Sequence, residues 1–371
     1  MNAGQDSRAR SVRLRRLPAV SFLALMSGFA LSQLVPLASA SASASASASA
    51  ASPTTTPPTT TTSSLVPSSN SSGCLASRPP KPGTTLQYMS AGGDSGGYFQ
   101  ELPTRYTGRS AIPVVVDLHG YGVSAADMLK ITKLGTYGNR DGFITITPQV
   151  ARRLPYWKTG FKSKDVAFLR GVISHVESTL CVDQNRLFVT GYSNGAIMAS
   201  VLACVDASQV AAIAPVSGIA NPAGCNPSRP VSVVAFHGTS DPLVPYTGGL
   251  GAEAYSLPLP QGTKGNISQL LGNNVPQSTK GPSIPKTTAA WAKRDGCAQT
   301  STTRVFAKNV ALISYACPNG ATVSLYRIRG GGHTWPGSVV DSKTNTLGAT
   351  TLAISADKII WNFFESHPLG A

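Results

Sequence analysis

One segment of the sequence has the residue types and spacing of an activated nucleophile. Residues 191–195 read GYSNG, the pattern G-x-S-x-G, and they follow an apolar run at 187–190 and open a helical pattern near Asn194. A turn from strand directly into helix is so tight that it requires small residues two positions before and two positions after the serine, and it leaves the serine exposed on strained backbone. The pattern therefore predicts that Ser193 is a nucleophile.

A serine hydroxyl is a weak nucleophile at neutral pH, so it needs a base within hydrogen-bonding reach and a carboxylate that orients the base. His333 follows an apolar run at 323–328 and three glycines, which places it on a loop beyond the end of a strand. The other histidines fit a turn, the middle of a helix or the chain end: His119, His237, His175 and His367. We predict that His333 is the base.

The carboxylate is assigned by the same reasoning about strand ends. Asp241 comes after an apolar run at 231–236 and occupies a loop beyond it. Asp165 and Asp295 are the alternatives, and Asp165 precedes a helix where it would serve as an N-cap. The chain order Ser193, Asp241, His333 is the one expected of α/β-hydrolases and differs from those of chymotrypsin and subtilisin.

Acyl transfer also requires donors that point at the oxyanion of the tetrahedral intermediate. One donor is the backbone N–H of Asn194, directly after the nucleophile. The second comes from the glycine-containing turn after the run 114–118, where we predict the N–H of Tyr121, with Gly122 as the alternative. Two tryptophans, Trp335 and Trp157, are candidates for the substrate pocket, although an aromatic residue at either place is equally typical of a core.

These side chains must be positioned by a layered α/β structure. Continuous apolar, β-branched runs indicate strands that are covered on both faces. They alternate with helical patterns, which predicts an α/β fold, a mostly parallel sheet with helices on both faces, in a single catalytic domain. The runs lie at 114–118, 143–147, 187–190, 210–216, 231–236 and 323–328, and the helical patterns at 165–180, 195–205 and 356–366. Residues 246–286 lack such patterns and are predicted to form a lid-like insertion.

The N-terminal part has the composition of an export signal and a spacer. The chain has 371 residues and a formal charge of +15, but residues 17–73 carry no charged side chain. A basic start, an apolar run and an Ala-Ser-Ala site predict a signal peptide over residues 1–40, with an uncleaved membrane anchor as the alternative. Residues 41–73, rich in Ser, Ala, Thr and Pro, are predicted to be a disordered linker. The catalytic domain then spans residues 74–371.

Export implies an oxidising compartment, where the even number of six cysteines favours disulfides. No zinc-type cysteine or histidine spacing occurs, so no metal or other cofactor is expected. The basic residues are scattered and lack a nucleic-acid-binding motif, so no nucleic-acid partner is expected either. The sequence predicts a secreted, extracellular protein without stable membrane insertion, or one tethered to the cell surface if the N-terminal segment is retained.

Four motifs together resemble the secreted bacterial esterases of the polyhydroxybutyrate depolymerase-like and feruloyl esterase-like family. They are LHGY at 118–121, GYSNG at 191–195, FHGTSD at 236–241 and GGHTWPG at 331–337. The resemblance implies the same triad and the same oxyanion donors, and it covers essentially all of residues 74–371. It also suggests three disulfides, which join Cys204 to Cys225, Cys297 to Cys317 and Cys74 to Cys181. Ala196 departs from the family, where a second glycine is frequent.

The function expected from the residues and the resemblance is that of a serine carboxylesterase that forms an acyl-enzyme. The first substrate hypothesis is feruloyl esterase-type action on hydroxycinnamoyl esters of xylan in plant cell walls. The alternative is hydrolysis of poly(3-hydroxybutyrate) or its oligomers. A third hypothesis, from another class, is an inactive hydrolase fold that serves as a surface binding module. The partner is thus an ester substrate, on a cell-wall polysaccharide or a polyester.

Overall fold

The computed structural model describes residues 69–259, 265, 281–318, 320–341 and 347–370. The predicted signal peptide and residues 41–68 of the predicted linker lie outside this range, as do residues 260–264 and 266–280 of the predicted insertion. No helix in the described ranges is long and apolar enough to cross a membrane.

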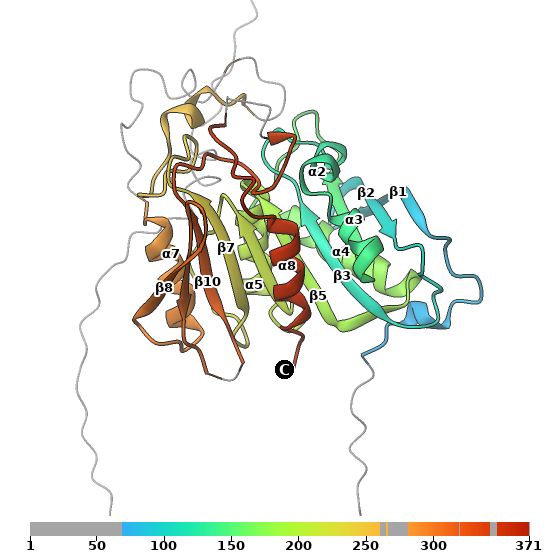
Figure 1. Cartoon of the computed structure of the whole chain (residues 1–371). Coiled ribbons are helices and arrows are strands. Elements are labelled where there is room, and N and C mark those ends of the chain that lie inside the picture. The colour runs from blue at the N-terminus through green and yellow to red at the C-terminus, as the bar shows by residue number, and fades with distance from the viewer. Residues whose placement is uncertain (1–68, 260–264, 266–280, 319, 342–346, 371) are drawn as a thin grey trace, which may run out of the picture.

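The described strands form one twisted sheet of ten strands (Figure 1). Their order across the sheet is β1-β2-β4-β3-β5-β6-β7-β10-β9-β8. The strands are β1 Gly83–Ala91, β2 Asp94–Leu102, β3 Ile112–Leu118, β4 Ile144–Val150, β5 Val182–Tyr192, β6 Ala212–Val216, β7 Ser232–Gly238, β8 Ser301–Ala307, β9 Val310–Tyr315 and β10 Val323–Ile328.

The middle of the sheet is parallel and its two margins are antiparallel. Strands β4, β3, β5, β6, β7 and β10 run in one direction. These are the six apolar runs read from the sequence, and their residues are buried on both faces, as in β7, where every residue is buried. The prediction of a mostly parallel sheet is therefore confirmed, and the carboxyl ends of six strands meet along one edge.

Helices cover both faces of the sheet, as predicted. Two separate apolar cores result: α4, α5 and α7 pack on one face, and α2, α3 and α8 on the other. Figure 1 shows α8 in front of the central strands. The helices are α2 Ala125–Thr132, α3 Leu134–Asp141, α4 Lys164–Thr179, α5 Asn194–Val205, α7 Ile284–Arg294 and α8 Ala356–Glu365, with 3-10 turns η1 Ser72–Leu75 and η2 Ala252–Ser256.

The helix starts follow from serines placed one residue ahead of them. Ser124, Ser163, Ser283 and Ser355 each accept a hydrogen bond from a backbone N–H in the first turn of α2, α4, α7 and α8. The cap of α4 is thus Ser163, and the prediction that Asp165 caps this helix is wrong. Asp165 instead lies within the first turn of α4 and is fully buried.

The folded body begins before the predicted boundary at Cys74. The backbone of Ser71 donates to Val182 O at 3.0 Å, and its hydroxyl donates to Leu180 O at 2.6 Å. Asn70 forms a β-bridge with Asp183 at the start of β5. Residues 69–73, whose composition alone assigns them to the linker, therefore belong to the folded body. Their polar groups form hydrogen bonds with residues at and just before the start of β5.

All six cysteines are in disulfides, in the pairing that the resemblance suggests. Cys74 joins Cys181, Cys204 joins Cys225 and Cys297 joins Cys317. The first bond fixes the N-terminal end of the body to the residue before β5. A disulfide stabilises a fold by about 2–4 kcal/mol, largely because it restricts the unfolded chain.

Candidate active site

Ser193 lies at the turn between β5 and α5 in a strained conformation. Its φ is 56° and its ψ is −116°, a combination that non-glycine residues rarely adopt. The two glycines of the motif are required by close packing: a Cβ at Gly191 would lie 2.5 Å from Gly195 C, and one at Gly195 would lie 2.1 Å from Leu118 O. The sequence thus forces the turn, and the turn leaves Ser193 partly exposed at the carboxyl edge of the sheet.

Asp241 and His333 meet across two loops of this same edge. The loop after β7 carries Asp241 and the loop after β10 carries His333, and Asp241 Oδ2 lies 2.8 Å from His333 Nδ1. The other carboxylate oxygen, Oδ1, accepts the backbone N–H groups of Leu243 at 2.9 Å and Val244 at 2.8 Å. Both side chains are buried, so the pair is fixed in a site that excludes most water.

A second histidine also faces the carboxylate. His237 Nε2, at the end of β7, lies 3.2 Å from Asp241 Oδ2 and 2.8 Å from Val244 O. Burial alone would raise the pKa of Asp241, but His333 and His237 outweigh it and hold that pKa well below its usual value. The sequence predicts that His237 shapes a turn and does not predict its contact with Asp241. The spacing of four residues between them is the signal in the sequence that could reveal this contact.

The far nitrogen of His333 is free to act on a ligand. A carboxylate accepts hydrogen bonds only, so Nδ1 carries a proton, and in the neutral ring Nε2 therefore holds the lone pair. Nε2 is buried and has no hydrogen-bond partner among the described residues. The backbone of His333 is held by its N–H, which donates to Leu347 O at 2.7 Å, and by Tyr192 Oη, which donates to its carbonyl.

The residue before the serine contacts the histidine, but no hydrogen bond joins Ser193 to His333 among the described residues. The ring of Tyr192, the residue before Ser193, lies 5.2 Å from the His333 ring. Among the contacts of the described residues, none joins the Ser193 hydroxyl to His333. Such catalytic hydrogen bonds are often long without substrate and shorten when it binds.

The two predicted oxyanion donors come from the residue after Ser193 and from the loop after β3. Asn194 is the first residue of α5, and the first N–H groups of a helix have no partner within it. The N–H of Tyr121 likewise has no acceptor in the described structure, whereas that of Gly122 donates to Pro155 O at 2.7 Å. Gly122, the alternative, is therefore already used, which favours Tyr121.

The Tyr121 side chain also contacts the segment before the undescribed part of the insertion. Its hydroxyl donates to Pro258 O at 2.6 Å. The ends of the insertion are joined by a hydrogen bond from Ile284 N–H to Tyr246 O at 3.0 Å. The described part of residues 246–286 thus reaches the loop that carries a candidate oxyanion donor.

The prediction that Trp157 and Trp335 line the substrate pocket is wrong, because both are 0% exposed. The Trp157 indole donates to His119 O at 3.0 Å, and the Trp335 indole donates to Asp357 Oδ1 at 3.0 Å. The Trp157 indole thus holds the loop after β3, and the Trp335 indole joins the loop after β10 to α8. Composition and spacing cannot distinguish such a supporting aromatic from one that faces substrate.

The remaining candidates lie away from the triad. Asp165 is paired with Arg152, and Asp295 caps the C-terminus of α7, where burial raises its pKa to about 7. His175 is exposed on α4. Across the described ranges, no three His, Cys, Asp or Glu side chains cluster as metal ligands would.

A family profile described as phospholipase/carboxylesterase matches residues 164–269, which include β5, Ser193 and Asp241. Together with the parallel sheet and the strained serine turn, this match identifies the fold. The chain has the α/β-hydrolase fold.

Fungal feruloyl esterases are among the proteins to which the chain is similar. It is 28% identical to feruloyl esterase B of Piromyces equi over 244 residues, 63% of this chain and 41% of that protein. It is 31% identical to a probable feruloyl esterase C of Aspergillus clavatus over 159 residues, 42% of this chain and 57% of that protein. A solved acetyl xylan esterase from Aspergillus awamori aligns at 17% identity with a TM-score of 0.49, over 76% of this chain and 99% of that one. The chain thus spans less than three fifths of the two curated relatives.

Proposed function

We propose that this α/β-hydrolase is a serine carboxylesterase with Ser193, Asp241 and His333 as its catalytic triad. The observation that carries the proposal is the buried Asp241–His333 pair, whose free Nε2 lies at the same sheet edge as the strained Ser193. The triad is defined by geometry and roles. Here an ionised acid orients an imidazole at the same sheet edge as a partly exposed hydroxyl.

In the first half of the reaction, Ser193 Oγ attacks the ester carbonyl carbon while His333 Nε2 takes the hydroxyl proton. The C=O bond becomes a single bond, and its negative oxygen is stabilised by the N–H groups of Asn194 and Tyr121. The ester C–O bond then breaks, and the proton on Nε2 passes to the departing alkoxide. The products are a free alcohol and an acyl-Ser193 ester.

In the second half, a water molecule replaces the alcohol. His333 Nε2 takes a proton from water as the oxygen attacks the acyl carbon, and the same proton returns to Ser193 Oγ as the acyl bond breaks. Asp241 remains ionised throughout and stabilises the imidazolium. The depressed pKa of Asp241 suits this role, because a protonated Asp241 could not orient Nδ1–H.

For the substrate we propose hydroxycinnamoyl esters of plant cell-wall xylan. The support is the two feruloyl esterases to which the chain is similar. Release of ferulate from methyl ferulate and from arabinoxylan tests this choice, measured beside clearing of a poly(3-hydroxybutyrate) suspension. Ferulate release without clearing is expected, and clearing without ferulate release would assign the polyester instead.

We further propose that the protein is exported, with residues 1–40 as a cleaved signal peptide and residues 41–68 as a spacer. Three disulfides are typical of an oxidising compartment. N-terminal sequencing of protein secreted by an expression host tests the cleavage site. A start at residue 41 is expected, and an intact N-terminus in the membrane fraction would contradict it.

The triad is tested by Ser193→Ala, with Ser174→Ala on the exposed face of α4 as the matched control. Ser193→Ala should lower kcat for p-nitrophenyl acetate by at least about 1,000-fold and abolish labelling by a fluorophosphonate, detected as a mass increase of the intact protein. Ser174→Ala should leave both unchanged. Ester hydrolysis that survives Ser193→Ala would exclude the proposed mechanism, whereas the absence of ester hydrolysis in the wild-type protein would favour the inactive binding module.

A further inference from the structure

The segment 152–158 contacts both sides of the candidate oxyanion site. Trp157 lies against Asn194, while its indole donates to His119 O and stacks on the His119 ring at 4.6 Å. Pro155 O accepts the N–H of Gly122, next to Tyr121. One short segment therefore touches the helix start that presents one donor and the loop that presents the other.

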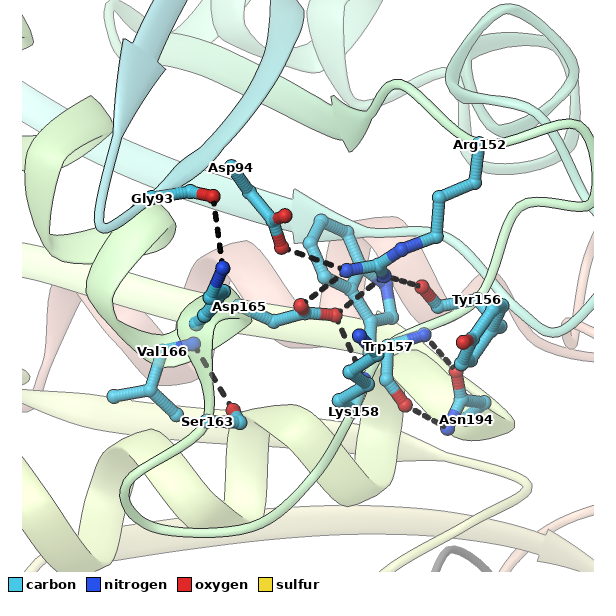
Figure 2. A network of polar contacts seen from close by, with 11 residues as sticks. Gly93, Asp94, Arg152, Tyr156, Trp157, Lys158, Ser163, Asp165, Val166 and Asn194 are labelled. Carbon is cyan, nitrogen blue, oxygen red and sulfur yellow. Dashed lines mark hydrogen bonds and ion pairs between the residues drawn. The ribbon is translucent and has the colours of Figure 1, made fainter. Parts of the chain in front are cut away.

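The contact with Asn194 consists of a reciprocal pair of hydrogen bonds (Figure 2). Asn194 Oδ1 accepts the N–H of Trp157 at 2.6 Å, and Asn194 Nδ2 donates to Trp157 O at 3.2 Å. A primary amide can make both bonds at once, whereas a carboxylate lacks the donor and a hydroxyl lacks the reach. Asn194 is 4% exposed, so the pair holds the first residue of α5 in one orientation.

Behind this contact lies an ion pair that is joined to it through two peptide units. Arg152 Nη1 donates to Tyr156 O at 2.8 Å, and this carbonyl belongs to the peptide whose N–H meets Asn194 Oδ1. Asp165 Oδ2 accepts the N–H of Lys158 at 2.7 Å, from the peptide whose carbonyl meets Asn194 Nδ2. The cation thus faces the carbonyl end of one peptide and the anion faces the N–H end of the next. Hydrogen bonds in such a chain polarise one another.

The ion pair itself is rigid. Arg152 Nη1 lies 2.6 Å from Asp165 Oδ2, and Nη2 bonds to Asp165 Oδ1 and, at 2.9 Å, to Asp94 Oδ2. The Arg152 side chain is 13% exposed and Asp165 is fully buried. A bidentate guanidinium–carboxylate pair fixes orientation as well as distance. A buried ion pair need not stabilise a fold. The functional argument therefore depends on the peptides that this pair contacts and not on its contribution to stability.

We propose that Arg152 and Asp165 are positioning residues for the oxyanion donors. They act through the peptides 156–158 and the Asn194 side chain, and they orient the Asn194 N–H and the loop of Tyr121 toward the developing oxyanion. The proposal rests on the proposed esterase function. Donors aimed in advance act mainly on the transition state, so the pair should affect kcat and leave substrate binding nearly unchanged.

The test uses Arg152→Met, Asp165→Asn and Asn194→Ala in the full chain, with hydrolysis of p-nitrophenyl acetate and inhibition by phenylboronic acid as readouts. The boronate forms a tetrahedral anion on the serine and therefore reports the oxyanion site. Each variant should lower kcat by about 10- to 100-fold, change KM by less than about 2-fold, and weaken boronate inhibition by a factor similar to the loss in kcat. Arg152→Lys, which keeps the charge but loses the planar fork, should recover only part of kcat.

A matched control comes from another arginine–aspartate pair on the same helix. Arg170 of α4 donates to Asp206 at 2.8 Å, and no hydrogen bond or ion pair joins it to segment 152–158 in the described structure. Arg170→Met should leave kcat and boronate inhibition unchanged, even if it lowers Tm. The effects of Arg152→Met and Asn194→Ala should not add in the double variant, because both act through the same peptide.

Three results would overturn the proposal: full kcat in Asn194→Ala, unchanged boronate inhibition in Asp165→Asn, or additive losses in the double variant. If neither ion-pair variant folds, Asn194→Ala decides the question alone, since it removes only the side-chain contact. Loss of activity in Ser193→Ala with full activity in Asn194→Ala would reject this inference and leave the proposed esterase intact. Retained activity in Ser193→Ala would reject the esterase mechanism itself.

Discussion

Two aspartates are buried near the carboxyl ends of strands on opposite sides of β5, and their surroundings give them opposite charge states. Asp241, after β7, has two histidine nitrogens and two backbone N–H groups around its carboxylate, and its pKa is depressed. Asp117, near the end of β3, has one hydrogen bond, at 2.8 Å to Thr132 Oγ1. Burial raises the pKa of Asp117 to about 8. Burial alone therefore does not decide the charge; the number of partners does.

The difference in charge state between the two aspartates fits the position of each residue in the molecule. Asp241 touches the proposed base and must remain charged to orient it. Asp117 lies beneath the loop that carries Tyr121, on the face covered by α2 and α8. There Asp357 also has a raised pKa, because it is buried and faces Asp117. Burial in this core favours the uncharged form of both acids.

The largest expected effect comes from removing the charge of each aspartate in turn. Asp241→Asn keeps the shape of the side chain but no longer favours the Nδ1–H form of His333. We expect kcat for p-nitrophenyl acetate to fall by about 1,000- to 10,000-fold. Asp117→Asn should change kcat by less than about 3-fold, since the residue is already neutral. Equal losses in the two variants would show that Asp117 also serves the reaction through its charge.

The comparison also shows what the sequence could and could not predict. Ser193, Asp241 and His333 follow strands with continuous apolar runs, so each could be placed at a strand end from local sequence. Strands β1 and β8 were missed because they lie at the margins with mostly exposed residues and show no such run. Single-sequence patterns detect burial on both faces far better than an edge strand.

Contacts between distant segments were beyond the same reasoning. The role of Arg152 depends on Asp165, Asp94 and the peptides around Trp157, which meet only in the folded chain (Figure 2). His237 could be placed at the end of a strand, but its approach to Asp241 depends on the turn that follows. The end of a strand can be predicted from local sequence. The hydrogen-bond partners of a side chain there depend on which loops meet at the edge of the folded sheet.

The two aspartates should also give opposite pH dependence of stability. Folded Asp117 keeps its proton up to about pH 8, while the unfolded chain releases it near 3.8. Between these values unfolding releases a proton, so this residue lowers the free energy of unfolding as pH rises. Asp117→Asn lacks that loss, and its stability relative to wild type should improve by up to about 4 kcal/mol from pH 4.5 to pH 8.

Urea denaturation at several pH values measures this difference, with Asp241→Asn as the comparison. The depressed pKa of Asp241 contributes stability that is present above about pH 4 and is lost at lower pH. Asp241→Asn should therefore be most destabilised, relative to wild type, at neutral pH. Parallel curves for wild type and Asp117→Asn would mean that Asp117 is ionised in the folded protein.

A smaller effect is expected from the second histidine at Asp241. His237→Phe removes one hydrogen-bond donor from the carboxylate, so the pKa of Asp241 should rise and activity should be lost at a higher pH on the acid side. We expect about a 10-fold fall in kcat near neutral pH and partial recovery in His237→Gln, which keeps a donor. His175→Phe, at an exposed position of α4, is the control. An unchanged acid limb in His237→Phe would show that His333 and the backbone alone keep Asp241 ionised.

The smallest effect tests the single hydrogen bond of Asp117. Thr132 Oγ1 donates to Asp117 Oδ2 at 2.8 Å and also lies 3.2 Å from Met128 O, so the threonine hydroxyl links the acid to the helix backbone. Thr132→Val keeps the shape and removes this link, which should cost about 1 kcal/mol in urea denaturation and leave kcat unchanged. Thr132→Ser keeps the hydroxyl and should retain most of the stability that Thr132→Val loses, apart from the missing methyl group. If Thr132→Val instead lowered kcat, the core beneath the Tyr121 loop would be coupled to the oxyanion donors, and the two aspartates would differ in charge but not in their importance to the site.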